Sequence, residues 1–265
     1  MAIYFDEEKK IFYLESGCMS YVMQISQFGF LTQLYYGKRI PREDVSYVEK
    51  LYDRGSEAVV FGAPSRRYSP NVITSEYPSY GKGDFRECAF IPRGDGARVF
   101  EGKVKGFEIL QEKPTIPGMP SLYGGGETLV VTLEDEISKV QVDLYYSVYD
   151  ELDAIARRAV IKNNADTPLV LDRAYSFSLD LPAGSYKVIT QYGAHMRERT
   201  PEVTPLMHGI MSVDSKRGAT SLHSSCFMAL AAKDADEESG DVYGFNLIYS
   251  GSFRLTAEQS PYDMV

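Results

Sequence analysis

Hydrophobic and polar residues alternate along most of this sequence, and this period of two constrains the fold more than any other feature. The clearest run places an apolar side chain at every second position: Val140, Val142, Leu144, Tyr146 and Val148. Successive side chains of a β-strand point to opposite faces, so such a run predicts a strand with one buried face. Similar short runs recur without alternating helices, which predicts an all-β fold, a large antiparallel β-sandwich of two stacked sheets.

Four segments carry more specific predictions. Period-two spacing predicts one strand face over 169–179 and another over 243–249. The Asp-Gly pair at 95–96 suits a hairpin turn. Apolar residues at helical spacing after Pro41 predict a helix over Arg42–Arg54, in a fold with at most one or two short helices.

Composition narrows the function classes. The 265 residues show no linker or internal repeat, so a single domain over 1–265 is expected. The net charge of −9 argues against nucleic acid or an anionic membrane as a partner, and no apolar run approaches the roughly 20 residues of a membrane span. Cys18, Cys88 and Cys226 are widely spaced and the first ten residues lack a signal-peptide core, which predicts a cytoplasmic protein with reduced thiols.

The stretch Glu76–Arg86 interrupts the strand pattern. It reads Glu-Tyr-Pro-Ser-Tyr-Gly-Lys-Gly-Asp-Phe-Arg. Its proline and glycines exclude a continuous helix or a central strand, so a loop with fixed turns is predicted. Tyrosine rings beside Lys and Arg suit a polyhydroxylated ligand, with apolar sugar faces on the rings and hydroxyls on the charges. The alternative is a tyrosine-rich loop that seals one end of the sandwich.

No catalytic or metal-binding motif accompanies this loop. His195, His208 and His223 lack the spacing of metal ligands, and the chain has no P-loop, G-x-S-x-G or dinucleotide fingerprint. Metal ions and cofactors are therefore predicted to be absent. Glu76 with Asp84, or Glu198 with either of them, would form a glycosidase pair only if the two carboxylates met in a pocket. Ordinary surface or ion-paired carboxylates are the alternative.

Several stretches together resemble one known family. They are Ser20-Tyr21-Val22, Leu34-Tyr35-Tyr36-Gly37-Lys38, Glu76-Tyr77-Pro78, Tyr80-Gly81, Gly83-Asp84-Phe85-Arg86, Gly193-Ala194, Arg197-Glu198-Arg199, Arg217-Gly218-Ala219, Gly244-Phe245 and Tyr249-Ser250-Gly251. In this order and spacing they are similar to the amino-terminal domain of α-galactosidases of glycoside hydrolase family 36. The resemblance spans essentially the whole chain.

The resemblance implies a β-supersandwich of the galactose mutarotase-like kind, followed downstream by a catalytic (β/α)8 barrel. In the family, two aspartates of the barrel cleave α-1,6-galactosides such as raffinose and melibiose with retention of configuration. This chain is therefore expected to be the non-catalytic part of an α-galactosidase-like enzyme, and whether it acts as an enzyme by itself stays open.

The resemblance also implies site residues and partners. In tetrameric members, loops of this domain reach a neighbouring subunit and close its galactose subsite. The matching loop covers 71–86, where the implied sugar contacts are Asn71, Tyr80, Lys82 and Arg86; Glu76 and Asp84 are expected to brace the loop. The expected partners are α-galactoside sugars, the chain's own barrel and neighbouring subunits of a homo-oligomer such as a tetramer.

Two positions depart from the family pattern. Asn71 stands where the family usually has Asp, and His195, the fifth implied sugar contact, stands where it usually has Trp. These changes predict weaker galactose binding or a different substrate. Two other function classes stay open: a stand-alone carbohydrate-binding or assembly module, and a mutarotase-like enzyme that would need His195 and Glu198 to meet in a pocket.

Overall fold

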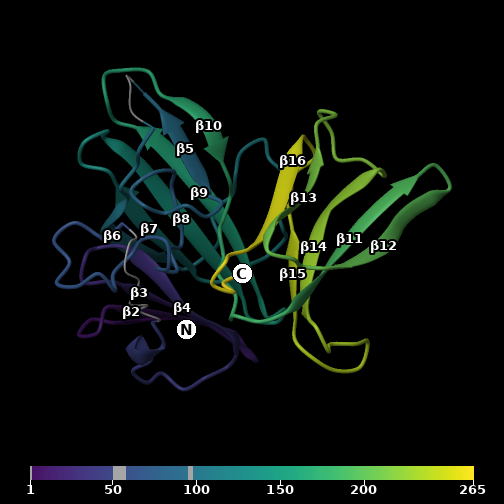
Figure 1. Ribbon diagram of the computed structural model, residues 1–265, viewed down its shortest axis with the longest axis horizontal. Coiled ribbons are helices and arrows are strands. Elements are labelled where there is room, and N and C mark those ends of the chain that lie inside the picture. Colours follow the sequence, from purple (N-terminus) through teal and green to yellow (C-terminus); the bar gives the residue numbers. More distant parts are fainter. Residues whose placement is uncertain (1, 50–57, 95–97) are drawn as a thin grey trace. The chain divides into compact units, whose positions relative to one another are not determined.

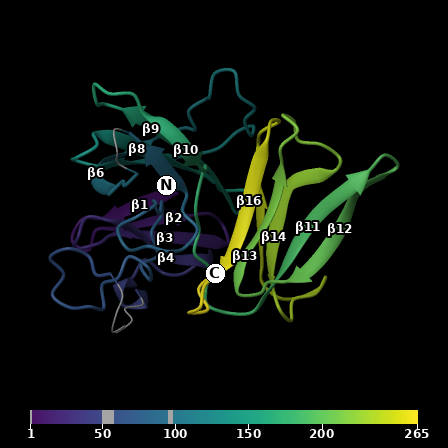
Figure 2. The ribbon, with the colours of Figure 1, turned by 45° about the horizontal axis from the view of Figure 1, so that its top comes forward.

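The protein is built from β-strands (Figure 1, Figure 2). The computed structural model describes residues 2–49, 58–94 and 98–265. In these ranges the single helical element is a one-turn 3-10 helix, η1 (Ser46–Val48), and no helix is long and apolar enough to cross a membrane. All pairings between the named strands are antiparallel. The predicted all-β antiparallel fold is confirmed.

The chain forms two compact units. The first unit comprises Met1–Pro114 and Tyr123–Asp180, and the second comprises Thr115–Leu122 and Leu181–Val265. The described strands divide into five sheets, three with four strands and two with two, in place of the two large sheets expected. Register shifts interrupt several of the ladders. Such bulges bend strands and end pairing, so they favour small sheets over continuous ones.

Two four-stranded meanders form the body of the first unit. The first meander consists of β1 (Ile3–Asp6), β2 (Ile11–Glu15), β3 (Met19–Ile25) and β4 (Leu31–Lys38). The second consists of β6 (Lys103–Leu110), β7 (Thr128–Glu134), β8 (Val140–Tyr149) and β9 (Ala154–Asn163). A small third sheet pairs β5 (Phe90–Arg93) with β10 (Val170–Ala174).

The two meanders share one hydrophobic core. Phe12 and Met23 of the first meander belong to the same buried cluster as Leu129 and Leu144 of the second. Every member of the 140–148 alternation is buried in β8, as the period of two predicts. Burying one such side chain contributes about 1.5–3 kcal/mol, and a slip by one residue would turn the whole set to the opposite face. The core therefore fixes the register of this sheet.

The second unit contains six strands in two sheets. In the four-stranded sheet the order is β12 (Arg197–Pro205), β11 (Tyr186–Ala194), β14 (Ser224–Ala232) and β15 (Val242–Asn246). The two-stranded sheet pairs β13 (Gly209–Ser215) with β16 (Phe253–Gln259). Val188 of β11 and Met228 of β14 are buried. This unit thus has its own sheets and its own buried side chains.

Gly193 occupies a bulge in β11, where close backbone contacts exclude a side chain. A Cβ at this position would lie 2.5 Å from the Arg197 carbonyl oxygen and 2.7 Å from that of Leu222. Both atoms belong to the main chain and cannot rotate away. Gly193→Ala is therefore expected to lower the free energy of unfolding by about 1–3 kcal/mol, measured by urea denaturation.

The matched control is Gly244→Ala in β15, where a Cβ would meet nothing within 4 Å. This change should leave stability the same or raise it slightly, because alanine loses less chain entropy than glycine on folding. Equal stability of the Gly193→Ala and Gly244→Ala variants would contradict the role assigned to the bulge.

Four local predictions need correction or lie outside the described residues. The helix over Arg42–Arg54 is wrong in its described part, where only η1 is helical; Val45 packs instead into a cluster with Ile11 and Val22. The strand observed in the predicted range 169–179 is the shorter β10 (Val170–Ala174). In place of the predicted strand over 243–249, the structure has β15 (Val242–Asn246). The hairpin turn at 95–96 and the rest of the helix, 50–54, lie outside the described residues.

Candidate functional site

The loop Glu76–Arg86 is tied to the strands of the first unit. The Glu76 N–H donates to the Leu31 carbonyl of β4 at 3.1 Å, and the Tyr80 N–H donates to the Phe90 carbonyl of β5 at 3.0 Å. Backbone bonds of this kind satisfy polar groups that would otherwise be costly to bury. The loop is therefore a defined structural element, as its proline and glycines predict.

The tip of the loop is a tight turn over 81–84. The φ angles of Gly81, Lys82 and Gly83 are 94°, 58° and 89°. Glycine adopts this left-handed region readily, whereas a side chain makes it strained. A Cβ at Gly83 would also overlap the side chain of Ala58. The two glycines thus allow the chain to present Lys82 at the apex of the turn.

A buried ion pair anchors the start of the loop. The Glu76 side chain is 1% exposed and accepts a hydrogen bond from Arg157 Nη2 at 2.6 Å. The Tyr146 hydroxyl donates to the same carboxylate oxygen at 2.7 Å, and the Tyr21 hydroxyl donates to the other oxygen. Tyr21 belongs to β3, Tyr146 to β8 and Arg157 to β9. This network, the Glu76 cluster, joins the loop to both meanders.

The charged and hydrogen-bonding groups of the Glu76 cluster complement one another. Burial raises the pKa of Tyr21 and Tyr146 well above the ordinary tyrosine value, and the negative charge of Glu76 acts in the same direction against the Arg157 cation. Burial alone would lower the pKa of Arg157, but Glu76 and the two phenols outweigh it and raise that pKa. At neutral pH the phenols are therefore neutral donors, and Arg157 is a cation.

Arg86 fixes the other end of the loop. Its guanidinium donates to Asp84 through Nε and Nη2, both at 3.0 Å, and to Asp180 at 3.2 Å. Nη2 also donates to the carbonyls of Pro70 at 3.3 Å and Ile73 at 2.7 Å. Fork-shaped, charge-assisted bonds of this kind hold geometry well. Arg86 therefore joins the loop to the preceding 70–73 segment.

Of the predicted sugar contacts, Asn71 and Arg86 lie together behind the turn. Asn71 is buried, and its Oδ1 accepts the Phe85 N–H at 3.0 Å. Asn71 and Arg86 thus link the same two segments, 70–73 and 84–86. Their observed bonds brace the loop, and their contact with a sugar stays a prediction.

Tyr80 and Lys82 lie at the exposed tip with Phe85. Tyr80 is 51% exposed and Phe85 is 76% exposed. The Lys82 ammonium lies 3.4 Å from a Glu101 carboxylate oxygen, in an exposed pair. Such surface pairs contribute little, so ligand hydroxyls can compete for both partners. The tip offers two aromatic rings, a cation and an acid, a combination that suits a polyhydroxylated ligand.

His195 belongs to the second unit, whereas the other four predicted sugar contacts belong to the first. It is exposed, in the turn between β11 and β12 of the second unit. The nearby Glu198 carboxylate accepts the Met196 N–H at 2.9 Å and is exposed as well. A mutarotase-like enzyme would need these two side chains to meet in a pocket, and both are exposed. The mutarotase-like alternative gains no support here.

Sequence reasoning missed the residues that hold Glu76. In the sequence, Tyr21 is part of a family motif and Tyr146 is part of an apolar run. Neither pattern marks these tyrosines, or Arg157, as partners of Glu76. A signal was available for Arg157, since it lies within the otherwise small and apolar sequence Ala-Ile-Ala-Arg-Arg-Ala-Val-Ile. An arginine inside a strand of a sandwich needs a partner, although the sequence does not name it.

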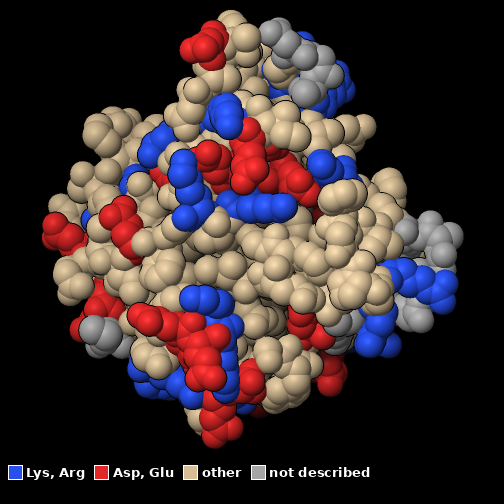
Figure 3. Space-filling model, turned by 90° about the vertical axis from the view of Figure 1, so that its left-hand side faces the viewer, with Lys and Arg blue, Asp and Glu red and all other residues tan. Residues whose placement is uncertain are grey.

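Charges of both signs are interspersed on the surface. On the face shown in Figure 3, Lys and Arg side chains lie beside Asp and Glu in mixed clusters. Lys105 pairs with Glu134, and Lys162 pairs with Asp143 at 2.6 Å. Among the described residues, no group of three or more His, Cys, Asp or Glu is placed to hold a metal ion. Charge does not single out a second site on the face shown.

Sequence comparisons agree with this architecture. The Glycosyl hydrolase family 36 N-terminal domain profile matches residues 29–265. The chain is 35% identical to the bifunctional alpha-galactosidase/sucrose kinase AgaSK of Mediterraneibacter gnavus, over 99% of this chain and 29% of AgaSK. It is 36% identical to the alpha-galactosidase AgaA of Geobacillus stearothermophilus, over 97% of this chain and 36% of AgaA. The chain thus spans about a third of the length of these relatives.

Solved structures share the fold. The galactosidase domain of AgaSK matches 99% of this chain with a TM-score of 0.95 and 34% identity, and the match covers 37% of that structure. A doubly substituted AgaA in complex with raffinose matches 96% of this chain with a TM-score of 0.91 and 35% identity, covering 36% of that structure. Another doubly substituted AgaA has been crystallised with stachyose.

Proposed function

This chain belongs to the family of glycosyl hydrolase family 36 N-terminal domains, and on this basis we propose that it is the non-catalytic N-terminal domain of an α-galactosidase. Its role is to present the loop Glu76–Arg86 at the subsite where the enzyme binds the galactose unit of α-galactosides such as melibiose and raffinose. Retaining hydrolysis needs two carboxylates about 5–5.5 Å apart, which a barrel outside this chain supplies.

The anchored loop is the observation that supports this proposal. The Glu76 cluster and the Arg86 contacts hold both ends of the loop, while Tyr80, Lys82 and Phe85 stay accessible at its tip. A site binds sugar more tightly when its side chains are held in place before binding, because little conformational entropy is then lost. The loop has this property without any catalytic group of its own.

Lys82 provides the test of the loop's role. In a protein that joins this chain to its barrel, Lys82→Ala is expected to lower kcat/KM on raffinose or melibiose about tenfold, mainly through a higher KM. The reason is that a charge-assisted hydrogen bond to a substrate hydroxyl contributes about 1.5 kcal/mol. Steady-state hydrolysis of both sugars measures the effect.

Lys105→Ala is the matched control. Lys105 is also exposed and also paired with a glutamate, Glu134, but it lies on β6 outside the loop. Its replacement should leave kcat/KM unchanged. If the Lys82→Ala and Lys105→Ala enzymes behave alike, the loop does not contact the substrate.

The 265-residue chain without a barrel is expected to release no product from a chromogenic α-galactoside, and hydrolysis by it would refute the non-catalytic role.

We also propose that the domain contributes to a homo-oligomer in the cytoplasm. Cys18, Cys88 and Cys226 are all free thiols, as expected in a reducing compartment. Light scattering of the barrel-containing protein should give the mass of a tetramer, in which a loop can serve a neighbouring subunit. A monomer of full activity would contradict this arrangement.

A further inference from the structure

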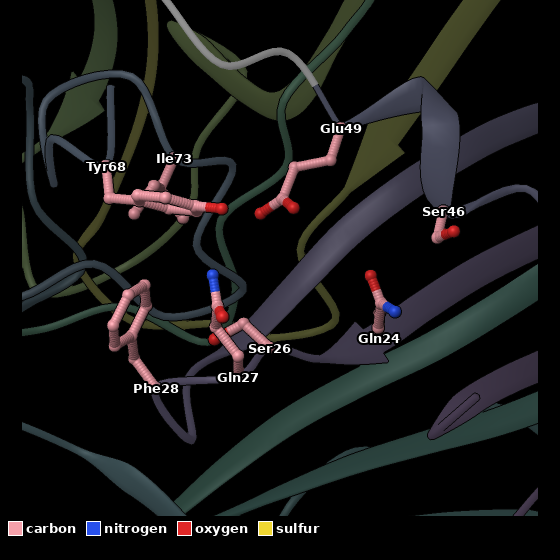
Figure 4. Close-up of a pocket in the computed structure, with 8 residues that line it drawn as sticks. All are labelled: Gln24, Ser26, Gln27, Phe28, Ser46, Glu49, Tyr68 and Ile73. Carbon is pink, nitrogen blue, oxygen red and sulfur yellow. The ribbon is translucent and has the colours of Figure 1, made fainter. Parts of the chain in front are cut away.

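A cavity of about 240 Å³ opens on the first unit (Figure 4). Its walls come from the β3–β4 turn, from the residues around η1 and from the segment 68–73. Pockets for drug-sized ligands start at roughly 300 Å³, so a cavity of this size suits a single small ring. None of its lining residues belongs to Glu76–Arg86.

The turn that forms one wall is rigid. The Ser26 N–H donates to the Phe30 carbonyl at 2.8 Å, and the Phe30 N–H donates back to Ser26 Oγ at 3.1 Å. Gly29 takes a φ of 84°, which closes the turn. This frame fixes the backbone of Gln27 and Phe28 beside the cavity. A site that is formed before binding requires little reorganisation.

One side of the cavity is aromatic. The rings of Phe28 and Tyr68 meet edge to face, with centroids 5.1 Å apart and planes at 74°. Buried Ile73 completes this wall. Rings arranged in this way offer an apolar surface to the C–H face of a ligand while the tyrosine hydroxyl stays available for hydrogen bonding.

The other side is polar. In Figure 4 the Tyr68 hydroxyl and the Glu49 carboxylate point toward each other, with the Gln27 amide near them and Gln24 and Ser46 farther round the rim. Within the described residues, no hydrogen bond engages the side-chain polar atoms of Gln27, Glu49 or Tyr68. Burial raises the pKa of Glu49. These groups provide both donors and acceptors to whatever occupies the space.

We propose that this cavity binds a neutral polyhydroxylated ring of monosaccharide size. Each hydroxyl of such a ligand both donates and accepts, so it can use the amides, the carboxylate and the phenol together, while its C–H face lies on Phe28 and Tyr68. An ammonium ligand would use the acceptors alone and leave the amide donors unpaired. The inference does not depend on the proposed function, because the loop takes no part in it.

The test is a titration of the 265-residue chain, labelled with ¹⁵N, with D-galactose, D-glucose and, separately, methylammonium. Sugar binding is expected to saturate with a Kd of about 1–10 mM. The backbone amides of Gln27, Phe28 and Tyr68 should shift. Tyr68→Phe and Glu49→Gln should each weaken binding roughly three- to tenfold, because each removes one hydrogen-bonding group at almost constant shape.

Two control variants locate the effect. Tyr47→Phe removes an exposed phenol from η1 that does not line the cavity, and Lys105→Ala removes an exposed cation from β6; both should keep the wild-type Kd. The proposal fails if no sugar saturates by about 100 mM. It also fails if Lys82→Ala rather than Tyr68→Phe weakens binding, or if methylammonium binds more tightly than either sugar.

Discussion

Arg157→Met is expected to lower the free energy of unfolding of this chain by about 3–5 kcal/mol, because it leaves the buried Glu76 carboxylate without its counter-ion. Arg157 is 10% exposed, and its guanidinium also donates to the Ser178 carbonyl at 2.8 Å and lies 4.6 Å from the centre of the Tyr146 ring. Methionine fills a similar volume but replaces none of these contacts. Urea denaturation followed by circular dichroism measures the loss.

The control for this prediction is Arg93→Met. Arg93 pairs with Asp172 at 3.2 Å, but both side chains are substantially exposed, at 48% and 32%. Exposed pairs contribute about 0–1 kcal/mol, so this variant should be close to wild type. The double variant Glu76→Gln with Arg157→Met should lose less than Arg157→Met alone, because no unpaired charge then stays buried. Similar losses in the Arg157→Met and Arg93→Met variants would contradict the importance of the Glu76 cluster.

The sequence predicted the fold wherever one segment carried its own signal. The alternation over 140–148 corresponds to β8 because a period of two, once buried on one face, leaves few other solutions. The strand face over 169–179 was too long because β10 is limited by its pairing with β5, with a register shift between Leu171 and Arg173. The helix predicted after Pro41 was wrong over the described residues 42–49 because Val45 packs into a cluster with residues distant in sequence and Arg42 pairs with Glu15. Tertiary contacts override local spacing in both cases.

For the candidate site, the sequence predicted the loop but not what holds it. Proline and glycine mark 76–86 as a loop through their own backbone limits, and this information is local. The partner of Glu76 is 81 residues away on β9, and the partner of Arg86 at Asp180 is 94 residues away. Such pairings exist only after the sheets have formed. Family resemblance predicted sugar contacts for Asn71 and Arg86, and the bonds observed for these residues are structural ones.

The free energy of unfolding of this chain is expected to fall more steeply at alkaline pH than its surface charges alone would cause. Burial raises the pKa of Tyr21 and Tyr146, so above a pH of about 10 the unfolded chain releases two protons that the folded chain keeps. The stability contributed by these phenols is fully present below that pH and is lost as the pH rises. Each adds a slope of about −1.4 kcal/mol per pH unit to the free energy of unfolding, measured by urea denaturation between pH 9 and 11.5.

Tyr146→Phe isolates this contribution. The variant loses the hydrogen bond to Glu76 and is less stable at neutral pH, but the alkaline slope should become shallower by about 1.4 kcal/mol per pH unit because one linked proton has been removed. Tyr123→Phe removes a fully exposed phenol and should leave the slope unchanged. A general loss of packing would lower stability equally at every pH. Parallel pH curves for wild type and Tyr146→Phe would therefore show that the phenols of the Glu76 cluster are not protected from ionisation.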